Sequence, residues 1–309
     1  MTLPTEGTTE TRFRIHPATR LGHVHLTVAD LERQISFYEQ VLGLRLHRRE
    51  GETAALGAGG ADLLRLSERR EARRVRGSTG LYHFAVLLPD RRELARAVAR
   101  LYSLRYRHYP TDHVMTKTTY LSDPEGNGIE LYADTPEEGS WGVADGEFVV
   151  RDATGALRSG REPLDVEALL KELTPGERLD LPMPEPTRIG HVHLHVAAIP
   201  PALRFYDDLL GFDVQLSSAE MGAAFVSAGG YHHHIGLNTW AGEGAPPPPP
   251  DALGLRYFTV VLPDRSELER TLARARAAVP LEEIPEGALL RDPSRNGVVL
   301  TDREDAPAR

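Results

Sequence analysis

The segment GHVHL at residues 22–26 recurs without change at residues 190–194, and this repeat decides the fold. A second block follows each copy: GLYHF at residues 80–84 recurs as GLRYF at residues 254–258. A third block, an Asp-Pro pair followed by Asn-Gly and an apolar strand pattern, also occurs once in each half. Three blocks in the same order at nearly the same spacing predict a duplicated chain.

The two copies differ at positions that matter chemically. The third block reads NGIEL in the first copy and NGVVL in the second, so Glu130 has Val299 as its counterpart. In the second block His83 has Tyr257 as its counterpart. Both copies must keep their packing residues to fold, whereas a ligand set is needed only where chemistry is done. We therefore interpret residues 20–134 as the working half.

The composition limits the classes of function. The chain has 309 residues, a net charge of −9 and no cysteine, so any metal site must use His, Asp, Glu or Tyr. The negative charge argues against nucleic-acid binding, which usually needs a basic face. No apolar run approaches the roughly 20 residues of a membrane span. The first 11 residues are polar and show no secretory signal. We expect a cytoplasmic protein with a small-molecule partner.

Each half divides into two modules that read as a strand, a helix and several strands. Residues 21–28 alternate apolar and polar side chains, as a half-buried strand does. Asp30 is typical of a helix N-cap, and Gly43 predicts the end of that helix. The second module repeats the pattern with a strand at residues 82–88 and a helix at residues 91–101.

Between the halves, one helix is predicted at residues 164–173 within a Gly/Glu-rich connector, and five prolines form a stiff spacer between the third and fourth modules. The predicted organisation is a tail at residues 1–17, a first paired domain at 18–134, a linker with a short helix at 135–186, a second paired domain at 187–303 and a tail at 304–309.

These blocks resemble the vicinal oxygen chelate superfamily, which includes glyoxalases, bleomycin-resistance proteins and extradiol dioxygenases. The segment GGYHHHIGLNTW at residues 229–240 is most similar to the bacterial catechol 2,3-dioxygenase-like branch. The resemblance implies an α+β fold of four βαβββ modules, paired into two cup-shaped mixed-sheet domains. It covers about residues 18–134 and 187–303.

The resemblance also implies a metal centre. In such cups the ligands come from the first strand of one module, the first strand of its partner and the last strand of that partner. With the first two modules as partners, those positions are His23, His83 and Glu130. Two imidazoles and one carboxylate form a facial triad with open positions, which suits Fe(II) best and also accepts Mn(II).

Two further residues of the second module match roles in ring-cleaving members of the family. Tyr120 lies ten residues before Glu130, the spacing of a tyrosine that hydrogen-bonds the substrate. His113 resembles the acid/base histidine of the family, although its spacing to Tyr120 is shorter than usual. The alternative for His113 is a loop histidine in solvent.

The run His232, His233 and His234 resembles a metal tract. On a strand, however, alternate residues face opposite sides, so at most two of them share a site. Without a carboxylate at Val299, we expect these histidines to brace an interface or line an empty cup. Whether His191, His232 and His234 form a second centre stays open.

The function that these residues predict is an extradiol ring-cleaving dioxygenase acting on a small aromatic diol and dioxygen. One alternative is a glyoxalase-like metal-dependent lyase or isomerase. Such enzymes commonly take a second carboxylate from the last strand of the first module, where Asp62 is the only acid within residues 61–66. A second alternative is a metal-free sequestering protein of the bleomycin-resistance kind. The sequence leaves the particular diol, the metal and any homo-oligomer undetermined.

Overall fold

The computed structural model describes residues 12–144 and 147–304, and it contains the four βαβββ modules in chain order. The first module comprises β1 (Arg20–Val28), α1 (Leu31–Phe37) with a π-helical turn (Tyr38–Leu42), β2 (Arg45–Glu50), β3 (Thr53–Gly57) and β4 (Asp62–Glu68). The second comprises β5 (Gly80–Leu87), α2 (Arg91–Ser103), β6 (Tyr109–Asp112), β7 (Thr116–Ser122) and β8 (Gly128–Asp134).

The third and fourth modules repeat this order after an insertion. The third comprises β13 (Arg188–His195), α4 (Ile199–Leu203) with a π-helical turn (Arg204–Leu209), β14 (Asp213–Ser218), β15 (Ala223–Ser227) and β16 (Ile235–Asn238). The fourth comprises β17 (Gly254–Val261), α5 (Arg265–Arg276), β18 (Glu282–Ile284), β19 (Gly287–Arg291) and β20 (Gly297–Thr301).

The insertion between the second and third modules contains mostly short strands. It comprises a 3-10 turn (Pro136–Glu138), β9 (Gly139–Ala144), β10 (Glu147–Asp152), β11 (Leu157–Arg158), β12 (Glu162–Pro163) and α3 (Val166–Leu170). Strands β9, β10 and β11 form a small antiparallel sheet, and β12 pairs with β6 at the edge of a large one. The helix predicted at residues 164–173 is present as α3, which is shorter and covers Val166–Leu170.

Local sequence signals account for the element boundaries. Asp30 accepts a hydrogen bond from the Arg33 amide and caps α1, as predicted. Gly43 ends the following turn with φ of 90°, a left-handed conformation that favours glycine. Asp90 caps α2 in the same way, with its side chain accepting from the Glu93 amide. The predicted helix at residues 91–101 is confirmed and extends to Ser103.

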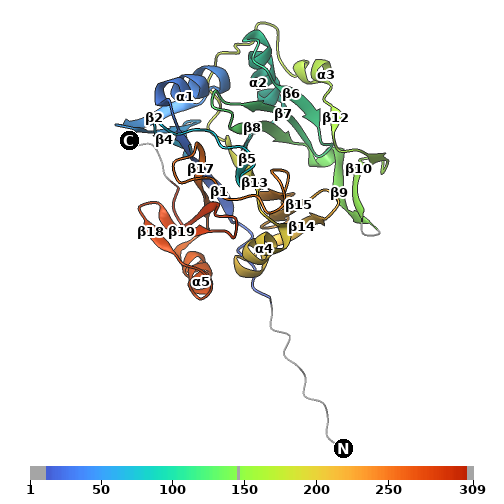
Figure 1. Cartoon of the computed structure of the whole chain (residues 1–309). Coiled ribbons are helices and arrows are strands. Elements are labelled where there is room, and N and C mark those ends of the chain that lie inside the picture. Colours follow the sequence, from blue (N-terminus) through green and yellow to red (C-terminus); the bar gives the residue numbers. More distant parts are fainter. Residues whose placement is uncertain (1–11, 145–146, 305–309) are drawn as a thin grey trace, which may run out of the picture.

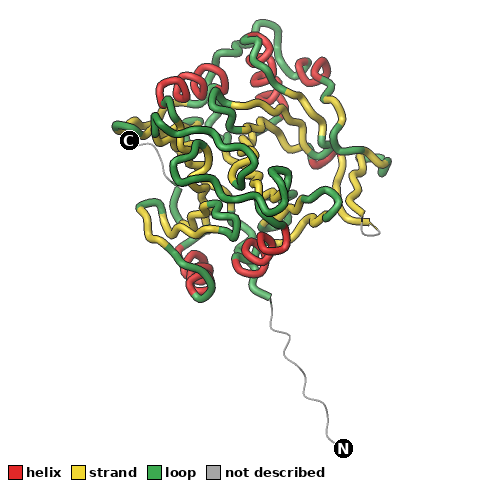
Figure 2. The backbone as a smooth tube through the Cα atoms, in the orientation of Figure 1, coloured by secondary structure: helices red, strands yellow, loops and turns green. Residues whose placement is uncertain are grey.

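Two large mixed sheets form the centre of the molecule, with the helices outside them (Figure 1, Figure 2). One has the order β18-β19-β20-β17-β1-β4-β3-β2 and joins the fourth module to the first. The other has the order β12-β6-β7-β8-β5-β13-β16-β15-β14 and joins the second module to the third. The α+β fold with four modules in two sheets is therefore confirmed.

The pairing of modules differs from the prediction. We expected the first and second modules to share a sheet within residues 18–134, and the third and fourth within 187–303. Instead β1 pairs with β17, and β5 pairs with β13, both antiparallel. All four first strands carry a similar apolar pattern, so the sequence does not distinguish which of them are neighbours; packing across the whole chain decides it.

Within each half, the modules are connected through their helices and loops. The buried Tyr38 hydroxyl donates to Asp123 Oδ2 at 3.0 Å, and the Tyr206 hydroxyl donates to Asp292 Oδ2 at 3.1 Å. Asp123 also accepts from the amide and side chain of Asn127, which fixes the loop before β8. The sequence repeat therefore corresponds to helix-to-loop contacts within each half, while the sheets join opposite halves.

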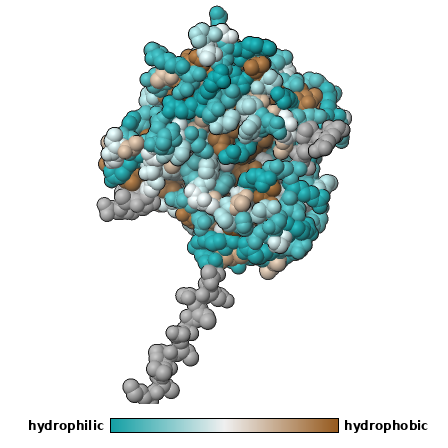
Figure 3. Space-filling model, turned by 180° about the vertical axis from the view of Figure 1, so that it is seen from behind, coloured by the Kyte–Doolittle hydropathy of each residue, from teal (hydrophilic) through white to brown (hydrophobic). Residues whose placement is uncertain are grey.

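Apolar side chains from all four modules form one continuous core. In the view from behind, hydrophilic residues cover most of the surface and apolar residues are scattered among them (Figure 3). Among the described residues, none of the helices combines the length and apolar character needed to cross a membrane.

Candidate metal centre

Three neighbouring strands bring one set of polar side chains together. Strand β5 lies between β8 and β13, and Ala85 on β5 is paired with Glu130 on one side and His191 on the other. His83 precedes Ala85 by two residues and therefore faces the same side of the sheet. Because Ala85 carries only a methyl group, the three longer side chains have room to converge above it.

The three side chains place one ligand atom each in a small triangle. His191 Nε2 lies 3.0 Å from Glu130 Oε2, and His83 Nε2 lies 3.2 Å from the same oxygen. The two imidazole Nε2 atoms are 3.3 Å apart. An ion about 2.1 Å from three mutually perpendicular ligands holds those atoms about 3 Å apart. The triangle therefore fits a divalent ion bound on one face.

The burial of this group supports the same conclusion. Glu130 is 3% exposed, His83 6% and His191 2%, and a buried carboxylate is costly unless a positive partner compensates it. Among residues 12–144 and 147–304, this is the group of three His, Asp or Glu side chains with atoms close enough to share an ion. The side chains offer the two-imidazole, one-carboxylate set typical of non-haem iron sites.

The pKa shifts of His191 and Glu130 favour the protonation states that bind a metal. Burial lowers the pKa of His191 to about 4, although Glu130 opposes that shift, so the imidazole is neutral near pH 7. Burial alone would raise the pKa of Glu130, but the contacts with His191 and His83 hold it well below its ordinary value. Neutral imidazole and ionised carboxylate are the forms that bind a metal.

His23, which we predicted as a ligand, lies in the other sheet. It is on β1, and its ring centroid is 5.7 Å from that of Tyr257 on β17. The carboxylate position of that cup is Val299, which packs with Tyr257 in a buried apolar cluster. His191 therefore takes the place predicted for His23, because the module that shares a sheet with the second module is the third.

The rule that we used for the ligand positions still describes the site. The first strand of the third module supplies His191, and the first and last strands of the second module supply His83 and Glu130. The candidate group does not lie within residues 20–134 alone, since His83 and Glu130 come from the first half and His191 from the second. The sequence feature that could have indicated His191 is the GHVHL motif around it, which is identical to the motif around His23.

The structure brings Tyr120 and His113 next to this group, as predicted. Tyr120 on β7 is paired with Glu130 on β8, and its ring centroid is 5.5 Å from that of His83. The Tyr120 hydroxyl lies 2.9 Å from His113 Nε2. On its other side, His113 Nδ1 contacts the carbonyl oxygen of Gly160 in the insertion. His113 lies in the turn between β6 and β7 and is half-buried, with both ring nitrogens in contact with protein groups.

These contacts assign the protons. A carbonyl oxygen only accepts, so Nδ1 of His113 carries a proton and donates to Gly160. The Tyr120 hydroxyl lies within hydrogen-bond distance of both His113 Nε2 and the Glu130 carboxylate. Burial, followed by the charge of Glu130, raises the pKa of Tyr120 well above its ordinary value, so the hydroxyl keeps its proton.

The run of three histidines lies in the segment before β16 and not on a strand, so the argument from alternating faces does not apply. His233 packs against the ligand candidate His191, with ring centroids 4.1 Å apart, and stacks on Phe225. His232 Nε2 contacts Asp134 of the second module at 3.3 Å. The run therefore joins the two modules beside the candidate centre, and we did not predict its contact with a ligand.

Aromatic side chains surround the group. Trp141 on β9 approaches the rings of His233 and Phe225 from the insertion, at 5.9 Å and 5.1 Å between centroids. On the other side, Tyr82 contacts the rings of His83 and Trp240. Flat apolar walls around a polar triangle suit a planar ligand that carries a few oxygen atoms.

Comparison with known proteins agrees with this geometry. The model of the glyoxalase/bleomycin resistance protein/dioxygenase superfamily matches residues 20–131 and 188–298. The chain belongs to this superfamily.

Two curated relatives illustrate the range of the match. The catechol-2,3-dioxygenase of Bacillus subtilis (strain 168) is 44% identical over 283 residues, which cover 90% of this chain and 95% of that protein. A lactoylglutathione lyase of Neisseria meningitidis is 31% identical over 122 residues, which cover 36% of this chain and 88% of that protein.

Solved structures share the fold at low sequence identity. A putative dioxygenase from Bacillus subtilis aligns with a TM-score of 0.61 at 14% identity, covering 95% of this chain and 87% of that one. A glyoxalase I variant from Zea mays aligns with a TM-score of 0.55 at 17% identity, covering 92% and 94%. At these identities, the alignments show the architecture alone.

Proposed function

We propose that this protein is an extradiol ring-cleaving dioxygenase that acts on a catechol-like substrate at a centre held by His83, Glu130 and His191. The observation that carries the proposal is the triangle of two imidazole nitrogens and one carboxylate oxygen. It occurs in a chain that is 44% identical over most of its length to a catechol-2,3-dioxygenase.

The ligand set fits Fe(II) first and Mn(II) second, because both accept imidazole and carboxylate ligands in six-coordinate geometry. When bound, the ion would supply open coordination positions at which the two diol oxygens and dioxygen meet. The protein's own contribution is to keep His191 neutral and Glu130 ionised, and to surround the three ligands with aromatic side chains.

Tyr120 and His113 provide a route for the proton that a catechol hydroxyl gives up on binding. The Tyr120 hydroxyl lies between the Glu130 carboxylate and His113 Nε2. It can therefore accept a proton from the substrate while passing its own to His113. The Gly160 carbonyl holds the His113 ring in the orientation that leaves Nε2 free to receive that proton.

His233 lies on the opposite side of the candidate ligands, against His191. Burial lowers its pKa well below the ordinary value, so the ring is neutral. His232 Nδ1 and His233 Nδ1 are 2.9 Å apart, so only one of the two can carry a proton there. A neutral imidazole at this position is able to accept or return a proton during ring opening.

The lyase alternative requires a second carboxylate, and the structure uses the predicted one elsewhere. Asp62 lies at the start of β4 in the other sheet, where it contacts His47 and Arg48. The last strand of the third module, β16, reads IGLN and carries no acid. The carboxylate count therefore favours the dioxygenase. The metal-free alternative is disfavoured because the ligand triangle is complete.

The experiment is anaerobic reconstitution with Fe(II), followed by a panel of catechols under air. Oxygen uptake in a one-to-one ratio with substrate, together with a yellow muconic semialdehyde-type product, is the expected result. Parallel loading with Mn(II) identifies the metal that supports turnover. If the iron-loaded protein converted none of the catechols, the proposal would be overturned. Turnover without oxygen would favour the lyase. A cytoplasmic location belongs to the same proposal and is checked by cell fractionation.

A further inference from the structure

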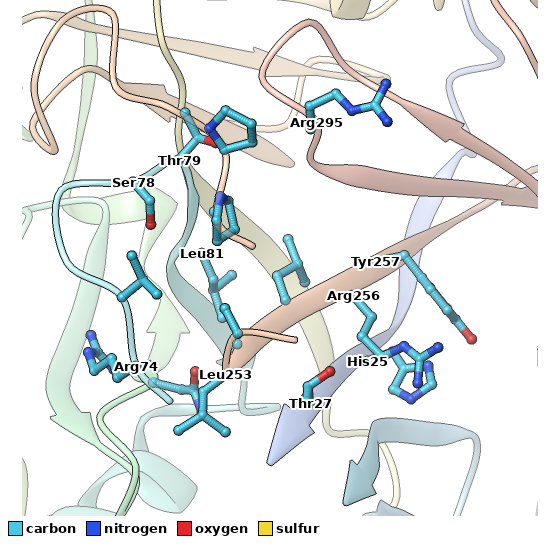
Figure 4. Close-up of a pocket in the computed structure, with 18 of the residues that line it drawn as sticks. His25, Thr27, Arg74, Ser78, Thr79, Leu81, Leu253, Arg256, Tyr257 and Arg295 are labelled. Atoms are coloured by element: carbon cyan, nitrogen blue, oxygen red, sulfur yellow. The ribbon is translucent and has the colours of Figure 1, made fainter. Parts of the chain in front are cut away.

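A cavity outside the candidate metal centre lies where strand ends and loops of both large sheets meet. Its volume is about 1350 Å³, and none of His83, Glu130 and His191 lines it. His25 and Thr27 on β1 and Tyr257 on β17 contribute to its wall, and the loop before β5 and the proline-rich loop before β17 complete it (Figure 4). Leu81 on β5 and His195 on β13 also line it, so the cavity lies between the ends of the two large sheets.

Arginines concentrate in this cavity, although the chain as a whole has a net charge of −9. Six arginines line it, against four acidic residues. Two of those acids are already engaged: Asp123 accepts from Asn127 and Tyr38, and Glu286 contacts Arg65. The cavity consequently carries an excess of positive charge.

Two of the arginines have guanidinium groups that no protein group uses. Within the described part of the chain, Arg256 on β17 and Arg295 in the loop between β19 and β20 make no side-chain hydrogen bond or ion pair. Arg256 extends toward His25 (Figure 4). The Nδ1 atom of His25 is buried without a partner, while its Nε2 contacts Ser67 Oγ at 2.8 Å. The unused guanidinium group of Arg256 and the unpaired Nδ1 atom of His25 therefore lie along the same wall.

The rest of the lining is apolar or aromatic. Leu81, Leu253 and Leu255 face the interior, four prolines at residues 247–250 form part of the cover, and Trp240 closes one side. A fully hydrated anion such as phosphate gains little from these surfaces, whereas a flat apolar body gains from burying its area. The lining therefore matches a molecule with one anionic end and one aromatic end.

We propose that this cavity is a second small-molecule site, separate from the metal centre, that binds an aromatic carboxylate. The carboxylate is held by Arg256, whose side chain extends toward His25 (Figure 4), because a guanidinium group donates two parallel hydrogen bonds to such an anion. Arg295 lies at the far end of the same cavity and adds to its positive charge. The aromatic ring lies against the leucines, the prolines and Trp240.

Trp240 provides a reporter inside the cavity. The chain has two tryptophans, so Trp141→Phe leaves Trp240 as the sole tryptophan of the full-length, metal-loaded protein. Its fluorescence is titrated with 4-nitrobenzoate, a quenching aromatic carboxylate, and with 4-nitrobenzyl alcohol, its neutral analogue. Saturable quenching by the carboxylate, at least about tenfold stronger than by the alcohol, is expected from the loss of charged hydrogen bonds.

The arginine variants separate this site from any other. In Arg256→Gln with Arg295→Gln the affinity for 4-nitrobenzoate should fall by about tenfold or more. Arg107→Gln, an exposed arginine outside the cavity, should leave it unchanged. The side chains of Arg256 and Arg295 are exposed, so we expect the double variant to fold, and circular dichroism checks this. Equal affinity in the double variant, equal quenching by the alcohol, or full displacement by inorganic phosphate would each overturn the proposal.

Discussion

His191 and His23 occupy the same position of an identical five-residue motif, but in the described part of the chain it is His191 that belongs to the group of three side chains able to share an ion. We expect His191→Ala to abolish metal binding and to lower kcat/KM by more than the roughly 100-fold that loss of an outer partner of a metal ligand costs. His23→Ala should keep the metal and the activity, with a loss of about 1–3 kcal/mol in unfolding free energy for a buried residue.

Metal content per chain, measured after reconstitution and gel filtration, checks this pair of variants. The comparison is matched in residue type, strand position and burial, so it isolates the contribution of the neighbours. If His23→Ala lost the metal while His191→Ala retained it, the assignment of the centre to β5, β8 and β13 would be wrong.

The Tyr120 hydroxyl acts on the substrate's proton in our proposal and does not hold the metal. Tyr120→Phe should therefore leave metal content unchanged and lower kcat by about 10²–10⁴, the usual contribution of a positioned acid or base. Tyr109→Phe is the control, because Tyr109 is the cross-strand partner of Tyr120 but is 52% exposed. Steady-state kinetics with catechol measures both. A Tyr120 variant with wild-type kcat would remove this residue from the mechanism.

At the scale of elements, the hairpin of β9 and β10 sets one wall of the centre through Trp141. Trp141→Ala should raise kcat/KM for 4-tert-butylcatechol relative to catechol by about tenfold, since an apolar contact contributes about 1–3 kcal/mol to discrimination. Phe148→Leu on the same hairpin is the control, because Phe148 contacts Trp141 but no histidine ring. An equal change for both substrates would show that the hairpin stabilises the fold without selecting the substrate.

Part of the fold and of the candidate site could be predicted from local sequence patterns. Residue patterns identified β1, the cap of α1 at Asp30 and helix α2, because each depends on local spacing and capping. They also selected as candidates His83, Glu130, Tyr120 and His113, which lie within one module and which the structure brings close together. They failed on His191, since its role depends on β5 and β13 being neighbours, a contact between distant segments that no local pattern encodes.

At the scale of the whole molecule, buried histidines should make stability depend on pH. Burial lowers the pKa of His25 to about 3 and that of His234 to about 4, both below the ordinary value near 6.5. Between about pH 6.5 and 4 the unfolded chain therefore binds more protons than the folded one, and stability falls as the pH falls. Each histidine contributes about 2 kcal/mol of this loss between pH 7 and 5.

Urea unfolding at pH 7 and pH 5 measures the effect. In His25→Gln, the amide replaces Nε2 as the partner of Ser67, and in His234→Asn it replaces Nδ1 as the acceptor for the Ala228 amide. The double variant should lose less stability on acidification than the wild type. An identical pH dependence in both proteins would show that these two histidines do not control the acid sensitivity.

The pairing of modules across the chain makes the halves interdependent. A fragment of residues 1–134 has β1 and β5 but lacks their partners β17 and β13, so two apolar strand edges are left unpaired. It also lacks His191. We expect this fragment to aggregate and to bind no metal, and co-expression with residues 135–309 to restore a one-to-one complex with metal and activity. Size-exclusion chromatography and metal analysis of each fragment alone and together provide the test, and a monomeric, metal-binding 1–134 fragment would contradict the observed pairing.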